Sequence, residues 1–218
     1  MLWSFGISMW KSCEMNKNKA PMIALFGPDG SGKSTVAELI AKRCKEIGVR
    51  SIRMHWRPGF LPYRKSSSQV GENRFTNPHS TNTRGCIKSF LVFLYIAIDF
   101  IAGYYFLIQP RLWNGDIVIY ERYYYDIIID QKRYGVRVPL ALRTFITKFI
   151  PIPDTIILLD ALGDIMRKRK GELTLAEIER QRLMMKKYLS RFDGFNIVDV
   201  GDSSPNEVAD IIFQIAMR

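Results

Sequence analysis

Residues 27–35 constrain the fold of this chain more than any other segment. They read G-P-D-G-S-G-K-S-T and fit the pattern G-x-x-x-x-G-K-[ST] of a phosphate-binding loop, the P-loop. An apolar run of strand length, residues 22–26, comes directly before the loop, and the apolar residues of 34–47 recur at helical spacing after it. A strand, a glycine-rich turn and a helix in this order predict the first unit of an α/β sheet.

The residue types in this loop suit a nucleoside triphosphate with Mg²⁺. Glycines let the backbone curl until successive N–H groups point at phosphate oxygens, and the helix that follows adds its positive end. We expect Lys33 to reach the β- and γ-phosphates of ATP and the Ser34 hydroxyl to bind Mg²⁺. The expected ATP-binding residues are Gly27, Pro28, Asp29, Gly30, Ser31, Gly32, Lys33, Ser34 and Thr35.

Four more segments of strand length, of which 117–120 and 155–159 are clearly apolar, alternate with helical patterns and predict a three-layer α/β fold of the P-loop kind. The expected sheet has five parallel strands with helices on both faces. The four segments are residues 50–56, 117–120, 155–159 and 196–200. Glu121 follows the third strand, at the edge where open α/β sheets bind ligands. We expect Glu121 to hold Mg²⁺ through water or to orient an acceptor hydroxyl, and Arg122 to bind a phosphate; a strand-end ion pair is the alternative.

The length of 218 residues fits one domain, or one domain with an elaborated lid. We expect a tail over residues 1–19 and a kinase domain over 20–218. The net charge is +11, and residues 42–88 alone contain eleven Lys and Arg but only Glu46 and Glu72. Such a cluster indicates an anionic partner, either a phosphorylated substrate, nucleic acid or acidic lipid, unless it is simply a solvated loop. Residues 57–86 lack periodicity and predict a mobile loop on the acceptor side.

The three cysteines, Cys13, Cys44 and Cys86, are odd in number and widely spaced. They indicate reduced thiols in a cytoplasmic protein. Residues 90–108 are apolar and almost long enough to cross a bilayer. Asp99 lies near their middle, where an acid costs ~2.5–3.5 kcal/mol on insertion scales. We therefore expect a buried core helix, with contact to a membrane surface as the alternative.

A basic run, Arg167 to Lys170, lies in a helical context within residues 164–182. The variable positions of the P-loop contain no arginine, so the cations that neutralise a transferring phosphoryl group must come from elsewhere. We expect residues 164–182 to form a helical lid whose Arg167, Arg169 and Lys170 act in catalysis with Lys33. A solvated basic helix face is the alternative.

From residue 22 to its end, the chain resembles the thymidylate kinase family of P-loop nucleoside monophosphate kinases, as a divergent member. The resemblance rests on five motifs in the family's order. Besides the P-loop, these are the long apolar helix that leads through I-Q-P-R-L-W-N-G-D-I-V-I-Y to E-R-Y, the strand P-D-T-I-I-L-L-D, the lid R-K-R-K-G-E-L, and V-D-V-G-D-S-S-P-N-E-V on the adenine side.

The resemblance implies an ATP-dependent kinase with dTMP as acceptor, bound by Arg57, Asp99, Arg122, Tyr123 and Gln131. It also implies a homodimer through the apolar helices. The chain departs from the family where the acceptor binds: H-W-R-P-G from His55 replaces an R-E-P-G-G-T clamp, Phe100 replaces an arginine near the base, and Glu121 replaces an aspartate. A kinase of a sugar or lipid-linked hydroxyl, and a nucleotide-binding regulator without catalysis, therefore stay open as alternatives. We expect no nucleic-acid partner for the kinase, while peripheral membrane contact is allowed.

Overall fold

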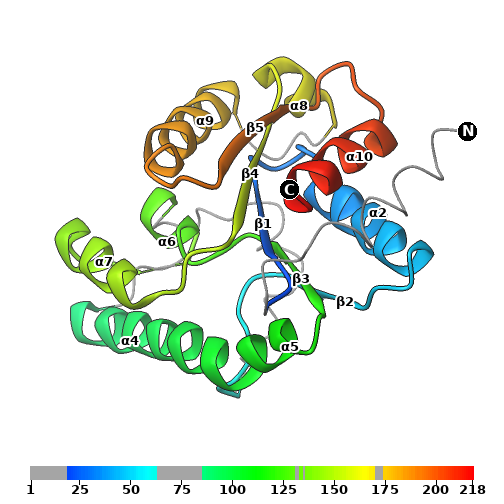
Figure 1. The fold of residues 1–218 in the computed structure, drawn as a ribbon. Coiled ribbons are helices and arrows are strands. Elements are labelled where there is room, and N and C mark those ends of the chain that lie inside the picture. Colours follow the sequence, from blue (N-terminus) through cyan, green and yellow to red (C-terminus); the bar gives the residue numbers. More distant parts are fainter. Residues whose placement is uncertain (1–18, 63–84, 131–132, 135, 170–173) are drawn as a thin grey trace, which may run out of the picture.

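The computed structural model describes residues 19–62, 85–130, 133–134, 136–169 and 174–218, and gives only the backbone of residues 167–169. Within these residues the fold is a five-stranded parallel sheet in the order β2-β3-β1-β4-β5 (Figure 1). The predicted α/β fold with five parallel strands is confirmed. The strands are β1 Met22–Phe26, β2 Ser51–Met54, β3 Ile117–Glu121, β4 Thr155–Asp160 and β5 Phe195–Asp199.

Helices cover both faces of the sheet, as expected. Alternate residues of β1 point to opposite faces, because side chains alternate along a strand: Met22, Ala24 and Phe26 pack in one core, and Ile23 and Leu25 in the other. On the first face lie α4 Cys86–Gly103, α6 Asp126–Ile129, α7 Leu140–Ile146 and α9 Leu175–Leu189; on the second lie α2 Lys33–Glu46 and α10 Pro205–Ala216 (Figure 1). Shorter elements are η1 Tyr104–Ile108, α5 Gln109–Trp113, η2 Thr147–Phe149 and α8 Gly163–Arg169.

The expected buried helix over residues 90–108 differs from the structure in length and in burial. It begins earlier, at Cys86, and continues through the π-helical turn η1 into α5. One side packs on the sheet through buried residues such as Phe93 and Phe100, whereas Leu91 and Ile98 are exposed. By length and composition alone Cys86–Trp113 could cross a membrane, and 39% of its most apolar window is buried. The expectation of a buried core helix is therefore right for one side of this helix and wrong for the other.

The order of the strands determines where a ligand binds. β1 lies between β3 and β4, with Leu25 level with Glu121 on one side and Phe26 level with Leu158 on the other. The chain reverses direction across the sheet at β1, and open parallel sheets bind ligands beyond the carboxyl ends of the strands at such a switch point. Residues that follow β1, β3 and β4 are thus brought to one edge.

Candidate functional site

The P-loop follows β1 at this edge, and its glycines take conformations that other residues adopt only with strain. Gly27, Gly30 and Gly32 have φ of 151°, 86° and 84°. A Cβ on Gly27 would lie 2.8 Å from the carbonyl oxygen of Leu159, whereas a Cβ on Gly32 would meet nothing within 4 Å. The open space at Gly32, where α2 begins without a side-chain cap, leaves backbone N–H groups available to phosphate oxygens.

Lys33 folds back over the loop. Its Nζ donates to the carbonyl oxygens of Gly27 and Pro28, at 2.8 and 2.7 Å, and to Ser31 Oγ at 3.2 Å. Burial lowers the pKa of the Lys33 ammonium from 10.5 to about 7, and the nearby positive charge of Arg122 acts in the same direction. The cation is therefore inside the loop that it is expected to serve, and a bound triphosphate would favour its charged form.

Ser34 and Glu121 meet across the switch point. Ser34 Oγ donates to Glu121 Oε2 at 2.5 Å, and Glu121 Oε1 accepts from Arg53 Nη2 at 2.8 Å. Burial pushes the pKa of Glu121 up, but the hydrogen bonds from Ser34 and Arg53 outweigh it and keep the pKa below its usual value. The pair suits Mg²⁺, which is commonly held by one or two protein oxygens together with substrate phosphates and water. The described residues contain no cluster of three His, Cys, Asp or Glu for a metal held by the protein alone.

Asp29 of the P-loop joins a network of buried charges. Arg122 bridges Asp29 Oδ1 at 2.5 Å and Asp126 Oδ2 at 2.8 Å, and Arg133 Nη2 lies 2.7 Å from Asp29 Oδ2. Burial would raise the pKa of Asp29, but Arg122 and Arg133 hold it well below the usual range. Arg122 also has φ of 87°, uncommon for a residue with a side chain, while its N–H pairs with the carbonyl of Leu25. The network places the Arg122 guanidinium beside the P-loop, on the expected acceptor side.

Arg57 and Asp99 form a second buried pair. Arg57 Nε donates to Asp99 Oδ2 at 2.7 Å, and the same carboxylate accepts from the backbone N–H groups of Gly59 and Leu61 at 3.3 and 2.6 Å. Asp99 is fully buried. Its oxygens are thus occupied by the segment that leaves β2, so Asp99 positions Arg57 and this segment.

Beside this pair lies an aromatic wall with an unpaired donor. Trp56 stacks on Tyr134 with ring centroids 4.3 Å apart and meets the edge of Phe100 at 6.1 Å. Among the described residues, the buried indole Nε1 of Trp56 has no hydrogen-bond partner, and neither has Oδ1 of Asp126, whose Oδ2 accepts from the Tyr134 hydroxyl at 3.3 Å. A buried polar atom without a partner is costly, and such atoms are frequent where a ligand supplies the missing bond.

Tyr123, one of the expected acceptor-binding residues, lies in the core of the structure. Tyr123 is buried in the core, its ring packs on Tyr120 and Phe100 at centroid distances of 5.0 and 5.3 Å, and its hydroxyl donates to the carbonyl of Pro151 at 2.7 Å. The Tyr123 hydroxyl therefore donates within the protein, and its contact with an acceptor stays a prediction.

The backbone of α8 carries Arg167 and Arg169, but their side chains lie outside the described part of the structure, as do Lys170, Gln131, residues 1–18 and residues 63–84 of the expected loop.

Sequence reasoning missed the charges that attach α9 to the sheet. Arg182 holds Asp160, at the end of β4, through Nε at 2.6 Å and Nη2 at 3.1 Å, and Lys186 Nζ lies 2.6 Å from the same carboxylate. The sequence shows the i,i+4 spacing of Arg182 and Lys186, but it does not show that both pair with Asp160.

A cavity of about 290 Å³ opens beside Asp160, on the expected adenine side. Its lining is Asp160, Ala161, Leu162, Ile165, Arg182, Ile197, Asp199, Gly201 and Asp202.

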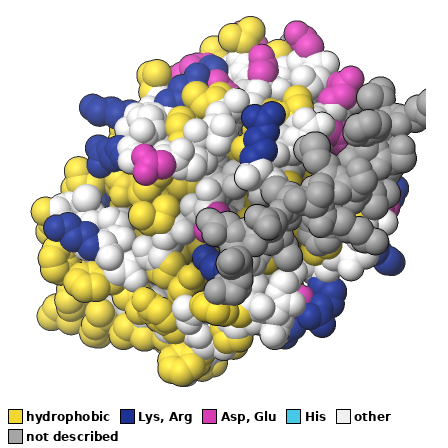
Figure 2. Space-filling view, viewed as in Figure 1, with side chains coloured by type: hydrophobic (Ala, Val, Ile, Leu, Met, Phe, Trp, Pro, Cys, Tyr) yellow, Lys and Arg dark blue, Asp and Glu magenta, His cyan; other side chains and the backbone are white. Residues whose placement is uncertain are grey.

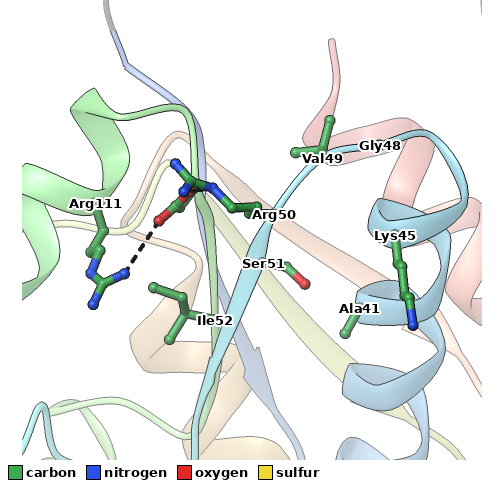
Figure 3. Close-up of a pocket in the computed structure, with 9 residues that line it drawn as sticks. Ala41, Lys45, Gly48, Val49, Arg50, Ser51, Ile52 and Arg111 are labelled. Atoms are coloured by element: carbon green, nitrogen blue, oxygen red, sulfur yellow. Dashed lines mark ion pairs between the residues drawn. The ribbon is translucent and has the colours of Figure 1, made fainter.

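Another cavity, of about 520 Å³, lies at the amino ends of β2 and β3, the opposite edge of the sheet from the P-loop (Figure 3). Arg50 and Arg111 reach toward one another there and both pair with Asp116, at 2.7 and 3.7 Å (Figure 3). Neither arginine belongs to the expected site, so this cavity is separate from it.

Comparison with known proteins gives a consistent result. Residues 26–212 match the family model described as thymidylate kinase. A probable thymidylate kinase of Archaeoglobus fulgidus is 30% identical over 190 residues, which cover 85% of this chain and 89% of that protein. A thymidylate kinase of Desulfotalea psychrophila is 26% identical, with coverage of 92% and 96%. The structure of thymidylate kinase from Candida albicans is similar in fold, with a TM-score of 0.62, 20% identity, and 92% of each chain covered.

The matched span includes the P-loop lysine, the Ser34–Glu121 pair and the acidic end of β4. These are the parts that a phosphoryl transferase requires at its donor side. The chain therefore belongs to the thymidylate kinase family, and it is an ATP-dependent kinase.

Proposed function

We propose that this kinase transfers the γ-phosphoryl group of ATP to dTMP in the presence of Mg²⁺. The names of its relatives support dTMP as the acceptor. The binding of ATP as phosphoryl donor is supported above all by the position of Lys33, which is buried inside the P-loop. The next residue, Ser34, is hydrogen-bonded to Glu121. These groups meet at the switch point of the sheet, where a triphosphate would contact all of them.

The reaction needs positioning and charge neutralisation, with no covalent intermediate on the protein. An oxygen of the acceptor phosphate attacks the γ-phosphorus, the bond to the β–γ bridging oxygen breaks, and ADP leaves. Ser34 and Glu121 would hold Mg²⁺, which would neutralise charge on the β- and γ-phosphates. Arg57 and Arg122 would hold the acceptor phosphate. Arg167, Arg169 and Lys170 would come from the lid.

The test is an ATP-consumption screen with dTMP, other nucleoside monophosphates and phosphorylated sugars as acceptors. We expect dTMP among the best acceptors. Lys33→Ala should reduce kcat by about 10²–10³-fold, because one phosphate-binding cation is removed from a water-excluded site. The matched control is Lys42→Ala, on the exposed side of α2, which should leave kcat unchanged. The absence of phosphoryl transfer to every nucleotide in the screen would overturn the proposal.

One observation favours a second acceptor class. Phe100, fully buried against Trp56, replaces the arginine expected near the base, and a non-nucleotide acceptor would not require that arginine. In the same screen, transfer to a sugar or lipid-linked hydroxyl without transfer to any nucleotide would establish that acceptor. No transfer to any acceptor by the intact protein would favour a nucleotide-binding regulator instead.

For location and assembly, we propose a cytoplasmic enzyme, in keeping with free thiols at Cys44 and Cys86. The resemblance to the family implies a homodimer, peripheral membrane contact is the alternative, and either would use the exposed side of α4.

A further inference from the structure

Arg53 of β2 is bonded to both members of the Ser34–Glu121 pair. Its Nη2 donates to Glu121 Oε1 at 2.8 Å and to the backbone carbonyl oxygen of Ser34 at 3.4 Å. Glu121 is only 5% exposed, and its other oxygen, Oε2, accepts from the Ser34 hydroxyl. The two oxygens of one buried carboxylate are thus divided between the arginine and the P-loop serine.

The pairing of β2 with β3 explains why Arg53 reaches this carboxylate. Arg53 is level with Ile119, and Glu121 follows two positions later on the same side of β3. That side of the sheet is covered by α2, because Ile119 packs in the same core as Val36 of α2. β2 is an edge strand, so the Arg53 side chain stays 36% exposed although its guanidinium contacts Glu121.

Two other charged side chains approach this contact more loosely. His55 Nδ1 lies 3.7 Å from Glu121 Oε2, beyond hydrogen-bond distance, and the His55 side chain is 82% exposed. Glu38 of α2 lies 3.9 Å from Arg53 Nη1 and is mostly exposed. Exposed ion pairs of this kind contribute little. Among the described residues, the orientation of Glu121 therefore depends on Ser34 and Arg53.

We propose that Arg53 is a positioning residue for the metal site: it holds the Glu121 carboxylate with Oε2 toward Ser34, the orientation in which both residues would hold Mg²⁺. Carboxylates that bind a metal are commonly fixed by such an outer hydrogen bond. Arg53 acts through Glu121 and not on the phosphates. The inference rests on the metal role that the proposed function gives to Ser34 and Glu121, and it does not depend on which acceptor is used.

The experiment is isothermal titration calorimetry of the full chain with ATP, once in excess Mg²⁺ and once in EDTA. The dissociation constant in EDTA divided by that in Mg²⁺ measures how far the protein uses the metal, and we call this quotient the metal ratio. We expect Arg53→Gln to lower the metal ratio about tenfold, the usual cost of losing an outer partner, with ATP binding in EDTA unchanged. Arg53→Lys keeps the charge without the planar fork and should recover part of the ratio.

The matched control is Arg43→Gln in the last turn of α2. It removes a comparable contact between an arginine and a carboxylate, 2.6 Å from Arg43 Nε to Asp210 Oδ1, about 13 Å along the helix from Ser34. The metal ratio should stay that of the parent. All these variants lie on the α2 side of the sheet, whereas the apolar surface at the lower left of Figure 2 lies over α4 and α7. Self-association through α4 should therefore be the same in each variant.

A double-variant cycle tests whether Arg53 acts through Glu121. Glu121→Gln should lower the metal ratio at least as much as Arg53→Gln, and adding Arg53→Gln to Glu121→Gln should lower it no further. A further loss in the double variant would mean that Arg53 contacts the phosphates directly, and it would overturn the inference. Equal weakening of ATP binding by Arg53→Gln in both buffers would indicate a merely structural role and would overturn it too.

The same data separate this inference from the proposed metal site. If Glu121→Gln lowers the metal ratio and Arg53→Gln leaves it unchanged or raises it, the metal site stands and the role of Arg53 is wrong. If Glu121→Gln leaves the ratio unchanged, the metal site is wrong and the inference fails with it. The thermal midpoint of each variant without ligand shows that the fold is kept.

Discussion

At the scale of single residues, Lys33 couples nucleotide binding to pH. Its pKa of about 7 in the free protein follows from burial and from Arg122. A triphosphate favours the ammonium, so the pKa must rise on binding and the protein must take up a proton at pH values above 7. We expect the ATP association constant to fall between pH 7 and pH 9, by up to about tenfold per pH unit. Calorimetry in buffers of different ionisation enthalpy measures the proton uptake.

The control for this prediction is Lys33→Arg, whose guanidinium stays charged throughout the range. It should bind ATP more weakly than the parent at pH 7 but show a flat dependence from pH 7 to pH 9. A flat profile in the parent protein would contradict the prediction, because the lysine would then already be charged in the free state.

A second prediction at this scale concerns the contribution of Trp56 to acceptor binding. Its buried Nε1 has no partner in the described residues, so an acceptor that supplies an oxygen there gains a hydrogen bond. Trp56→Phe keeps a ring against Tyr134 and removes the N–H. We expect KM for the acceptor to rise about fivefold to tenfold with KM for ATP unchanged. Trp113→Phe, exposed on α5, is the matched control. Equal acceptor KM in the parent and Trp56→Phe would show that the N–H faces no acceptor atom.

Single residues of the donor side could be predicted from the sequence, because the P-loop pattern fixes the roles of Lys33 and Ser34 at once. Partners could not. Asp29 is held by Arg122 and Arg133, about a hundred positions away, and only the folded sheet brings them together. The burial of Tyr123 could not be predicted for a related reason: the residue after Arg122 turns back into the core, and no local pattern indicates it.

At the scale of elements, the turn from β1 to α2 can be tested by comparing two glycines. Gly27 and Gly48 both have positive φ, 151° and 77°, so alanine is strained at either position. Only at Gly27 would the new Cβ also press on β4, 2.8 Å from the Leu159 carbonyl oxygen; at Gly48 it would meet nothing within 4 Å. We expect Gly48→Ala to cost about 1 kcal/mol of stability with normal kinase activity. Gly27→Ala should cost more and abolish ATP binding, as measured by thermal unfolding with and without ATP.

Elements in which apolar residues form clear runs or recur at regular spacing were predicted well. The helix α4 shows the limit of predicting burial from such spacing. Strands β1, β3 and β4 stand out because continuous apolar runs end at an acid or a glycine. The sequence of α4 is apolar on every side, so it contains no pattern that separates Phe93, which packs on the sheet, from Leu91, which faces outward. Burial there depends on which elements happen to cover the helix, and that is a tertiary property.

At the scale of the whole molecule, the site joins segments from β1, β2, β3 and α4, so ATP with Mg²⁺ should stabilise the entire domain. At a ligand concentration of about 100 times Kd the gain is ~2.7 kcal/mol. For a chain of this size that corresponds to a rise in thermal midpoint of roughly 5–10 °C. Differential scanning calorimetry measures it. A metal chelator should remove most of the rise, and an undiminished rise would contradict the Ser34–Glu121 metal site.

The internal bonds of Lys33, described above, have a consequence for the enzyme's cycle. In the free protein this ammonium satisfies the carbonyls of its own loop, so the loop keeps its shape between turnovers without a ligand. Nucleotide binding is then an exchange of one set of partners for another. Part of the intrinsic affinity is given up to break the old bonds, and the same bonds re-form as ADP departs. The empty state thus competes with the product for one cation, which favours release.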